Sequence, residues 1–174
     1  MKRFAFAAAI LAVALGAAAQ QPQQPNPMDA VPDKMPNDIP YGTPITLDRA
    51  QAAIAAALAE SNKRGWKLNV AVVDSGANLV AFARMDGAQL GSIAIAEHKA
   101  RAAAKFRRET KTFESGIQEG NLHYLLTLDD VIASRGGILI IDNGQISGAI
   151  GCSGGTGSQD EVVCKAGVDA VMKK

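Results

Sequence analysis

The position of the prolines divides this chain of 174 residues into two parts. All seven prolines lie between residues 22 and 44, and none follows. Proline fixes φ at about −65° and has no backbone N–H, so residues 20–44 are expected to be an extended, solvated spacer. Met28, Met35 and Tyr41 offer an alternative, in which parts of the spacer lie against the domain or a neighbouring subunit. At about 150 residues per domain, residues 45–174 are expected to form one domain.

The first nineteen residues have the features of a secretory signal peptide. Lys2 and Arg3 precede a run of small apolar residues at positions 4–19, which ends in three alanines. A basic start, a short apolar stretch and an A-x-A ending are typical of such a peptide. The alternative is a membrane anchor, but the run is shorter than the roughly 20 residues that span a bilayer. We therefore expect cleavage after Ala19, no membrane span in the mature chain, and a periplasmic or secreted protein.

The charge and composition exclude several classes of protein. The chain has 18 Lys and Arg residues against 17 Asp and Glu residues, a formal net charge of +1. Binding to nucleic acid needs a basic excess, so no such partner is expected. Apolar residues make up 48% of the chain but aromatic residues only 5%, so alanine supplies much of the apolar content, as in closely packed helices. Two cysteines are too few for a disulfide-rich scaffold or a four-cysteine zinc site.

The first half of the domain has the pattern of a helix, two strands and two further helices. Thr46 is a good N-cap for the first helix, and Gly65 is a typical C-terminal stop. Alternating apolar residues then predict strands, and helical periodicity follows, less regular in its second part. The expected elements are a helix over 46–64, strands over 68–72 and 79–85, and helices over 92–106 and 112–119.

The last third returns to strands and ends in a helix. Asn143-Gly144 is a pair that a two-residue type I′ turn prefers, so strands over 138–142 and 145–151 are expected to form a hairpin. Ser158 and Glu161 form a predicted capping box for a helix that ends near Met172. Short hairpins make neighbouring strands antiparallel, and helices must cover the faces of the sheet. The sequence therefore predicts an α/β fold with an antiparallel sheet.

A glycine-rich link, residues 148–158, joins the last strand to the last helix. Backbone N–H groups at the start of a helix bind phosphate or carboxylate groups, so this link is one candidate anion site. It has neither the Gly-Lys-Ser/Thr of a P-loop nor the G-x-G-x-x-G spacing of a dinucleotide site. Asp160 and Glu161 would also repel a bound anion. The alternative is a tight turn that lets strand and helix pack closely.

Several short motifs, in the same order along the chain, resemble the HbpS/GlcG-like haem-binding proteins. The resemblance covers essentially all of residues 45–174, and the combination is more specific than any single motif. The motifs are Val72-Val73-Asp74 with Gly76, Leu79-Val80-Ala81, Arg84-Met85-Asp86-Gly87-Ala88, Lys99-Ala100 with residues 103–106, Gly148-Ala149-Ile150-Gly151, Ser153-Gly154-Gly155 and Gln159-Asp160-Glu161.

This resemblance implies a three-layer α/β/α sandwich with a central antiparallel sheet of about five strands, a profilin-like architecture. The same architecture occurs in the C-terminal domain of PduO-type corrinoid enzymes. The resemblance further implies haem as the ligand, with a corrinoid as the less favoured alternative, and homo-oligomers, often octamers. The iron ligand is not uniform in the family, so it has to be sought among the residues of this chain.

Two histidines, His98 and His123, are the candidate ligands for haem iron, because imidazole is the commonest strong ligand. His98 lies on the expected central helix, and His123 lies in an irregular stretch beside Tyr124, which is a further candidate. The alternative for each histidine is an ordinary surface or hydrogen-bonded position. Met85 is a weaker axial candidate, and the alternative for it is core packing. No C-x-x-C-H motif is present, so c-type covalent attachment is excluded.

Basic side chains are the candidate partners for haem propionates or another carboxylate. Arg84, Lys99 and Arg101 have this role, and Ser153, Gly154 and Gly155 complete the candidate cofactor-binding set. The alternative is a solvated helix face with ion pairs to Glu97 or Asp86. A second cluster, Arg107-Arg108 with Lys105 and Lys111, is too short and too interrupted by acids to indicate nucleic acid.

Cys152 and Cys164 lie on either side of the glycine-rich link. In an oxidising compartment they are expected to form a disulfide, which for so small a loop contributes roughly 2–3 kcal/mol. The alternatives are two buried thiols, or a thiolate ligand to iron.

The sequence thus favours an exported haem-binding protein without catalytic residues, acting in haem sequestration, transport or sensing. One alternative is an enzyme for oxidative haem breakdown or a peroxidase-like reaction. Another is an oligomer that binds a small carboxylate through Arg84, Lys99 and the glycine-rich link.

Overall fold

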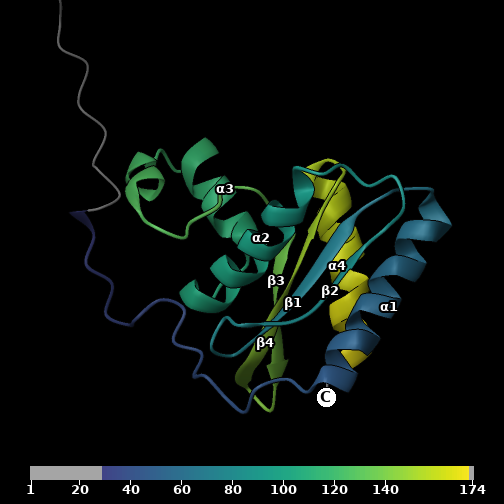
Figure 1. Ribbon diagram of the computed structural model, residues 1–174. Coiled ribbons are helices and arrows are strands. Elements are labelled where there is room, and N and C mark those ends of the chain that lie inside the picture. Colours follow the sequence, from purple (N-terminus) through teal and green to yellow (C-terminus); the bar gives the residue numbers. More distant parts are fainter. Residues whose placement is uncertain (1–28, 173–174) are drawn as a thin grey trace, which may run out of the picture. The chain divides into compact units, whose positions relative to one another are not determined.

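The computed structural model describes residues 29–172, so the expected signal peptide (1–19) and residues 20–28 of the spacer lie outside the described residues (Figure 1). The sheet and all the helices named here belong to one unit that begins at Asp33. Its elements are α1 (Leu47–Arg64), β1 (Asn69–Asp74), β2 (Leu79–Arg84), α2 (Ser92–Phe106), α3 (Thr110–Gln118), the short 3-10 helix η2 (His123–Thr127), β3 (Gly137–Asp142), β4 (Gln145–Ser153) and α4 (Gly157–Val171).

The sheet has four strands in the described part of the chain, in the order β2-β1-β4-β3, and every neighbouring pair is antiparallel. The predicted α/β class and antiparallel sheet are therefore confirmed, whereas the expected fifth strand is not. The β3–β4 turn is the predicted one, because Asn143 and Gly144 both have positive φ, at 49° and 76°. This conformation is the one that a type I′ turn requires.

The last part of the proline-rich spacer lies against the domain. The N–H of Gly42 donates to the carbonyl of Ile146, and the N–H of Ile146 donates to the carbonyl of Pro40, each at 2.8 Å. The hydroxyl of Tyr41 lies 3.0 Å from the carbonyl oxygen of Ala104 in α2. Residues 40–42 therefore lie against the domain, which is the alternative considered for parts of the spacer.

Helices lie on both faces of the sheet (Figure 1). On one face, α1 and α4 pack over Val70 and Val72. On the other face, α2 packs over Ala71 and Val73, the residues that alternate with them. This period of two along β1 places each apolar side chain in one of two cores.

Small residues let α2 approach the sheet closely. Gly137 of β3 and Gly151 of β4 face α2, and a Cβ added at Gly151 would clash with the Ala96 carbonyl oxygen. The facing side of α2 is alanine, including Ala96, Ala100 and Ala103, all fully buried. The alanines of α2 and the glycines of β3 and β4 together therefore allow the close contact between helix and sheet.

The helix termini follow the sequence, with one correction. α1 has Thr46 as its N-cap and ends at Gly65, whose φ of 69° is left-handed. The capping box of α4 was expected at Ser158 and Glu161, but Thr156 and Gln159 form it. Ser158 cannot be the N-cap because it already lies within the helix, whereas Thr156 has the extended backbone that the position requires.

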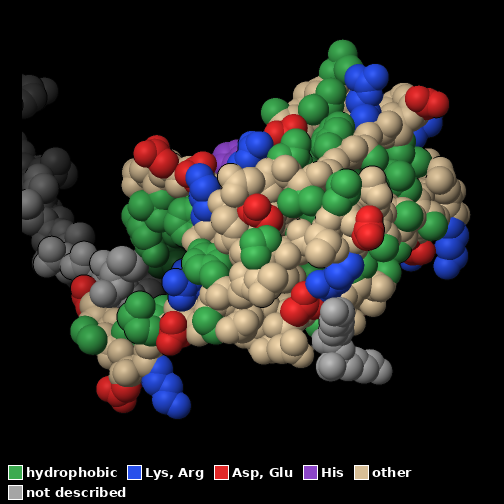
Figure 2. Space-filling model, turned by 60° about the horizontal axis from the view of Figure 1, so that its bottom comes forward, with side chains coloured by type: hydrophobic (Ala, Val, Ile, Leu, Met, Phe, Trp, Pro, Cys, Tyr) green, Lys and Arg blue, Asp and Glu red, His purple; other side chains and the backbone are tan. Residues whose placement is uncertain are grey.

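Charged side chains of both signs are interspersed over the face of the molecule that Figure 2 shows. In the described part of the chain, no helix is long and apolar enough to cross a membrane.

Candidate functional site

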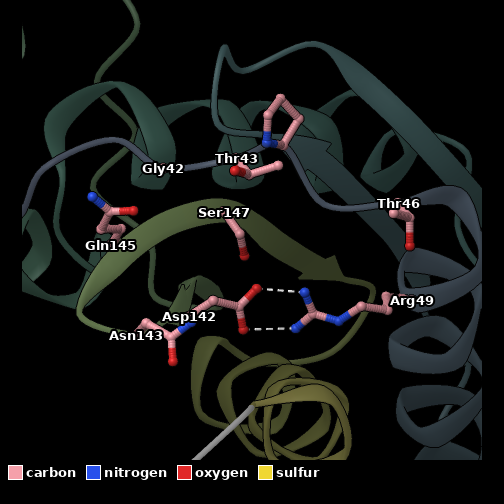
Figure 3. Close-up of a pocket in the computed structure, with 9 residues that line it drawn as sticks. Gly42, Thr43, Thr46, Arg49, Asp142, Asn143, Gln145 and Ser147 are labelled. Atoms are coloured by element: carbon pink, nitrogen blue, oxygen red, sulfur yellow. Dashed lines mark hydrogen bonds and ion pairs between the residues drawn. The ribbon is translucent and has the colours of Figure 1, made fainter.

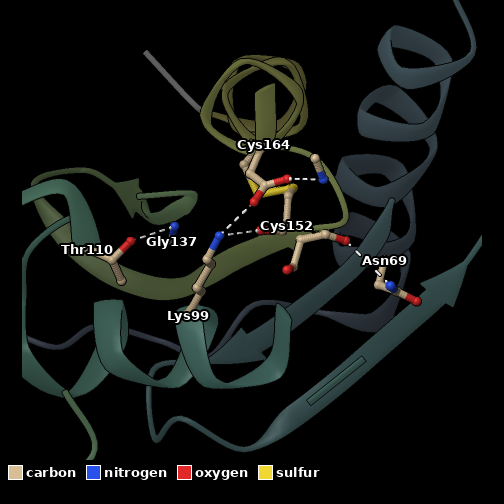
Figure 4. Close-up of a disulfide and its surroundings, with 9 residues drawn as sticks. Asn69, Lys99, Thr110, Gly137, Cys152 and Cys164 are labelled. Carbon is tan, nitrogen blue, oxygen red and sulfur yellow. Dashed lines mark hydrogen bonds and ion pairs between the residues drawn. A yellow bond between two sulfur atoms is a disulfide. The ribbon is translucent and has the colours of Figure 1, made fainter. Parts of the chain in front are cut away.

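A buried ion pair fixes the glycine-rich link (Figure 4). The Lys99 Nζ of α2 lies 2.7 Å from Asp160 Oδ2 of α4 and 3.2 Å from the carbonyl oxygen of Cys152. The two side chains are only 1% and 3% exposed. Lys99, one of the predicted propionate partners, therefore has its ammonium group enclosed and paired inside the chain.

The backbone donors of the link are also paired within the chain. The N–H of Gly155 donates to Asp160 Oδ1 at 3.0 Å, and the N–H of Thr156 donates to Gln159 Oε1 at 2.8 Å. Burial raises the pKa of Asp160, while Lys99 and the backbone N–H groups of Gly154 and Gly155 act in the opposite direction. The carboxylate of Asp160 thus occupies the position that an external anion would take. Of the three groups expected to bind a small carboxylate, only Arg84 is left open.

Cys152 and Cys164 are joined in a disulfide with an S–S distance of 2.08 Å, as the sequence suggested for an oxidising compartment (Figure 4). Both residues are fully buried. The bond links the end of β4 to α4, beside the Lys99–Asp160 pair, and it leaves neither sulfur as a thiolate for iron.

An open cleft lies beside Trp66, where α1 ends and β2 ends. A cavity of about 410 Å³ is lined there by Leu58, Asn62, Gly65, Trp66, Lys67, Arg84, Met85 and Asp86. A second cavity, of about 300 Å³, shares residues 65–67 and extends to Gly87, Gln89, Gly154, Gly155 and Gln159. We call these two cavities together the Trp66 cleft. Four of the predicted cofactor-binding residues therefore line the Trp66 cleft: Arg84, Met85, Gly154 and Gly155.

The Trp66 cleft combines an aromatic ring with side chains of both charges, the cations Lys67 and Arg84 and the acid Asp86. Neither Lys67 nor Arg84 makes an ion pair with any described residue. The Arg64 guanidinium lies 5.1 Å from the centre of the Trp66 ring, a cation–π arrangement. Met85 lines the same cleft, and its sulfur accepts the Leu68 N–H at 3.4 Å. These groups suit a flat, largely apolar molecule with acidic substituents.

Both histidines lie outside the lining of the Trp66 cleft. His98 is half-buried on α2, and its Nε2 atom is buried without a hydrogen-bond partner among the described residues. His123 is exposed at the start of η2, beside the exposed Tyr124. Arg101 pairs with Glu97 at 2.8 Å, which is the alternative considered for it. Ser153 is buried.

A third cavity, of about 260 Å³, is polar and structural in character (Figure 3). Arg49 of α1 binds both carboxylate oxygens of Asp142, and its Nη2 donates to the Val171 carbonyl at 2.7 Å. These bonds tie α1, the β3–β4 turn and the end of α4 together. The cation of this cavity is therefore already neutralised. No group of three or more metal-ligating side chains occurs among residues 29–172.

The sequence interpretation missed Trp66 and Lys67. The available signal was that Trp66 is the only tryptophan of the chain and directly follows the helix-stopping Gly65. Trp66 and Arg84 line the same cleft because β2 pairs with β1, and the spacing of residues in the sequence does not predict this proximity.

The fold and the cleft define a small α/β domain with helices on both faces of an antiparallel sheet and an open aromatic and cationic cleft at one end of two strands. A family model described as "Haem degrading protein HbpS-like" matches residues 45–169. The chain belongs to this HbpS-like family, so the resemblance inferred from the motifs is confirmed.

Individual relatives agree with this assignment. The protein GlcG of Escherichia coli strain K12 is 40% identical over 109 residues, which are 63% of this chain and 81% of GlcG. A double mutant of HbpS from Streptomyces reticuli has a TM-score of 0.71 at 26% identity, over 83% of this chain and 98% of the other. A complex of PduOC with haem has a TM-score of 0.67 at 21% identity, over 75% and 100% of the two chains, which is a likeness of fold.

Proposed function

We propose that this protein binds haem, or a closely related tetrapyrrole, in the Trp66 cleft. The observation that carries the proposal is that Lys67 and Arg84, which form no ion pair within the described part of the chain, line the same cleft as Trp66. Haem is a flat apolar disc with two carboxylates, so it needs an aromatic or aliphatic surface and nearby cations. Membership of a family described as haem-degrading, and the haem bound to PduOC, support the choice of ligand.

The residues of the cleft fit the two halves of such a ligand. Leu58, Trp66 and Met85 offer apolar surface to the macrocycle, while Lys67 and Arg84 offer donors to the propionates. When bound, haem would supply an iron centre for ligand binding or redox chemistry. The chain's own part is to orient the disc and neutralise its acids.

The iron ligand is a separate element of the proposal. Met85 is the candidate within the cleft. His98 lies outside it, and its Nε2 atom, buried and without a partner among the described residues, would have to be uncovered before it could reach iron. Since neither histidine lines the cleft, a histidine ligand there would come from a second copy of the chain. The exposed His123 is suited to that role. Homo-oligomerisation, for which the family resemblance implies octamers, is therefore part of the proposal.

Haemin titrations of single variants assign the ligand. We expect a saturable shift of the Soret band with the native chain, and an altered band position in one of Met85→Leu, His98→Ala and His123→Ala. Arg101→Gln is a matched control, because Arg101 already pairs with Glu97. Unchanged spectra in all three ligand variants would remove these candidates, and the absence of saturable binding would remove the function itself.

A second candidate function, haem breakdown, is favoured by the description of the family. Its test is the loss of the haem spectrum on addition of peroxide or reductant, with release of iron. Rates above those of free haemin under the same conditions would support an enzyme, and equal rates would support binding alone.

We further propose that the protein is exported and acts in the periplasm or outside the cell. The basic and apolar start of the sequence supports this, as does the disulfide, because disulfides persist in oxidising compartments. The intact mass of protein recovered from the periplasm tests it. A chain that begins at Gln20 is expected, and an uncleaved chain confined to the cytosol would contradict it.

A further inference from the structure

A fourth cavity, separate from the Trp66 cleft, lies along the free edge of the sheet. It has a volume of about 420 Å³ and runs beside β3, which is the last strand of the four. Its apolar lining comes from the spacer, from β3 and from α4: Ile39, Ile138, Leu139, Ile141, Val168 and Met172. We call it the β3-edge cleft. Its volume lies within the range of small-molecule sites.

Two arginines at the end of α2 line this cleft and are held in place by aromatic rings. The Arg108 guanidinium lies 5.5 Å from the centre of the Phe113 ring, and its Nε donates to the Phe106 carbonyl at 3.1 Å. The Arg107 guanidinium lies 4.7 Å from the centre of the Tyr41 ring. Stacked guanidinium groups are pre-oriented, so little rotamer entropy is lost when they bind a carboxylate.

These arginines keep most of their charge available. Arg108 makes no ion pair with any described residue, and Arg107 meets only Asp38, at 3.6 Å and largely in solvent. Two of the three acids that line the cleft are paired: Glu161 lies 2.9 Å from Lys111, and Asp169 lies 3.2 Å from Lys165, a third cation of the lining. Glu109 is the one acid of the lining without an ion pair in the described chain. The cleft therefore joins an apolar floor to a rim on which the guanidinium groups of Arg107 and Arg108 are open to an anion.

We propose that the β3-edge cleft binds a monocarboxylic acid with an aliphatic chain. The carboxylate would bind Arg107 and Arg108, and the chain would lie on the apolar residues of β3 and α4. A carboxylate on an aliphatic chain matches this combination of two guanidinium groups and an apolar floor. This site is independent of the proposed haem site, because no residue lines both clefts.

Octanoate is the probe that tests this proposal, measured by calorimetry on the full mature chain. We expect saturable binding, with acetate and octan-1-ol at least about tenfold weaker, because each lacks one half of the ligand. Arg108→Gln and Arg107→Gln are each expected to weaken octanoate binding about tenfold or more. Glu109→Gln is expected to strengthen it. Arg84→Gln is the matched control and should leave octanoate binding unchanged.

Three results would overturn the proposal. The first is no saturable binding of octanoate, and the second is equal binding of octanoate and octan-1-ol. The third is a loss of subunit association, rather than of octanoate affinity, in Arg108→Gln, which would show that a second copy of the chain covers the cleft. Haemin titration of the same variants distinguishes the proposed haem site from the β3-edge cleft. An altered Soret shift in Arg108→Gln but not in Arg84→Gln would move haem to this cleft and refute the haem assignment, whereas the octanoate titrations decide the β3-edge assignment.

Discussion

Lys99 and Asp160 form an ion pair of 2.7 Å although they lie on helices that cover opposite faces of the sheet. Because both side chains are buried, each charge depends on the other for its solvation. The pair also holds the carbonyl of Cys152 and the N–H of Gly155, so it sets the course of the glycine-rich link. The conformation of one wall of the Trp66 cleft therefore depends on this pair.

Removal of one member of this pair should be far more damaging than removal of both. We predict that Asp160→Asn or Lys99→Met lowers the free energy of unfolding by about 3–5 kcal/mol, because the remaining polar group is left buried without its partner. The double variant Lys99→Met with Asp160→Leu should recover much of this loss. Chemical denaturation of the oxidised protein measures the effect.

The matched control is the exposed pair of Lys165 and Asp169, in which Nζ and Oδ1 lie 3.2 Å apart. Lys165→Met should change the free energy of unfolding by at most about 0.5 kcal/mol. If the buried and exposed pairs gave similar losses, the structural role assigned to Lys99 and Asp160 would be wrong.

The disulfide should contribute to stability through the loop that it closes. Cys152 and Cys164 are 12 residues apart, and closing so small a loop is expected to stabilise the fold by roughly 2–3 kcal/mol. Reduction under denaturing conditions followed by refolding should lower the denaturation midpoint accordingly. A reduced protein with the same midpoint as the oxidised protein would contradict the prediction.

Acid should weaken the contact between Glu114 and Arg135. The Arg135 guanidinium lies 2.6 Å from the Glu114 carboxylate and lowers its pKa below the usual value. A lowered pKa in the folded state means that the unfolded state binds more protons, so this contribution is complete above the usual pKa and is lost as the pH falls through the lowered one. We predict that Glu114→Gln makes the loss of stability on acidification shallower. If the free energy of unfolding of Glu114→Gln fell with decreasing pH as steeply as that of the native chain, the prediction would be wrong.

The close approach of α2 to β4 should not tolerate a methyl group. Gly151→Ala places a Cβ against the Ala96 carbonyl, so we expect a loss of about 1–3 kcal/mol or more from overpacking. Gly91→Ala is the control, because its backbone has an ordinary negative φ of −59° and no atom lies within 4 Å of an added Cβ. Equal thermal midpoints for the two variants would contradict the packing assigned to α2.

The local structure was largely predictable from the sequence. The β3–β4 hairpin follows from Asn143-Gly144, and the limits of α1 follow from Thr46 and Gly65, because turns and helix ends depend on neighbouring residues. The order of the elements and the family could also be inferred. The capping box of α4 was misplaced by two residues, since Thr156 and Ser158 both have side chains that can cap a helix.

The long-range partners were not predictable in the same way. Lys99 was expected to face a ligand, yet its partner Asp160 is 61 residues away, and nothing in either segment indicates that they meet. An anion site with free donors was one of two alternatives for the glycine-rich link, but the side chains of Asp160 and Gln159 in α4 accept from the N–H groups of Gly155 and Thr156. The role proposed for Trp66 depends on Arg84 and Met85, which lie at the end of β2 and line the same cleft. Local patterns encode elements, whereas the site depends on how the elements assemble.

The proposed haem site is tested most directly by haemin titrations that compare variants inside and outside the Trp66 cleft. The account predicts a Soret shift that saturates at one haem per cleft, with binding about tenfold weaker in Lys67→Gln and Arg84→Gln and unchanged in Arg101→Gln. Equal haem affinity in all three variants would place haem elsewhere and contradict the account.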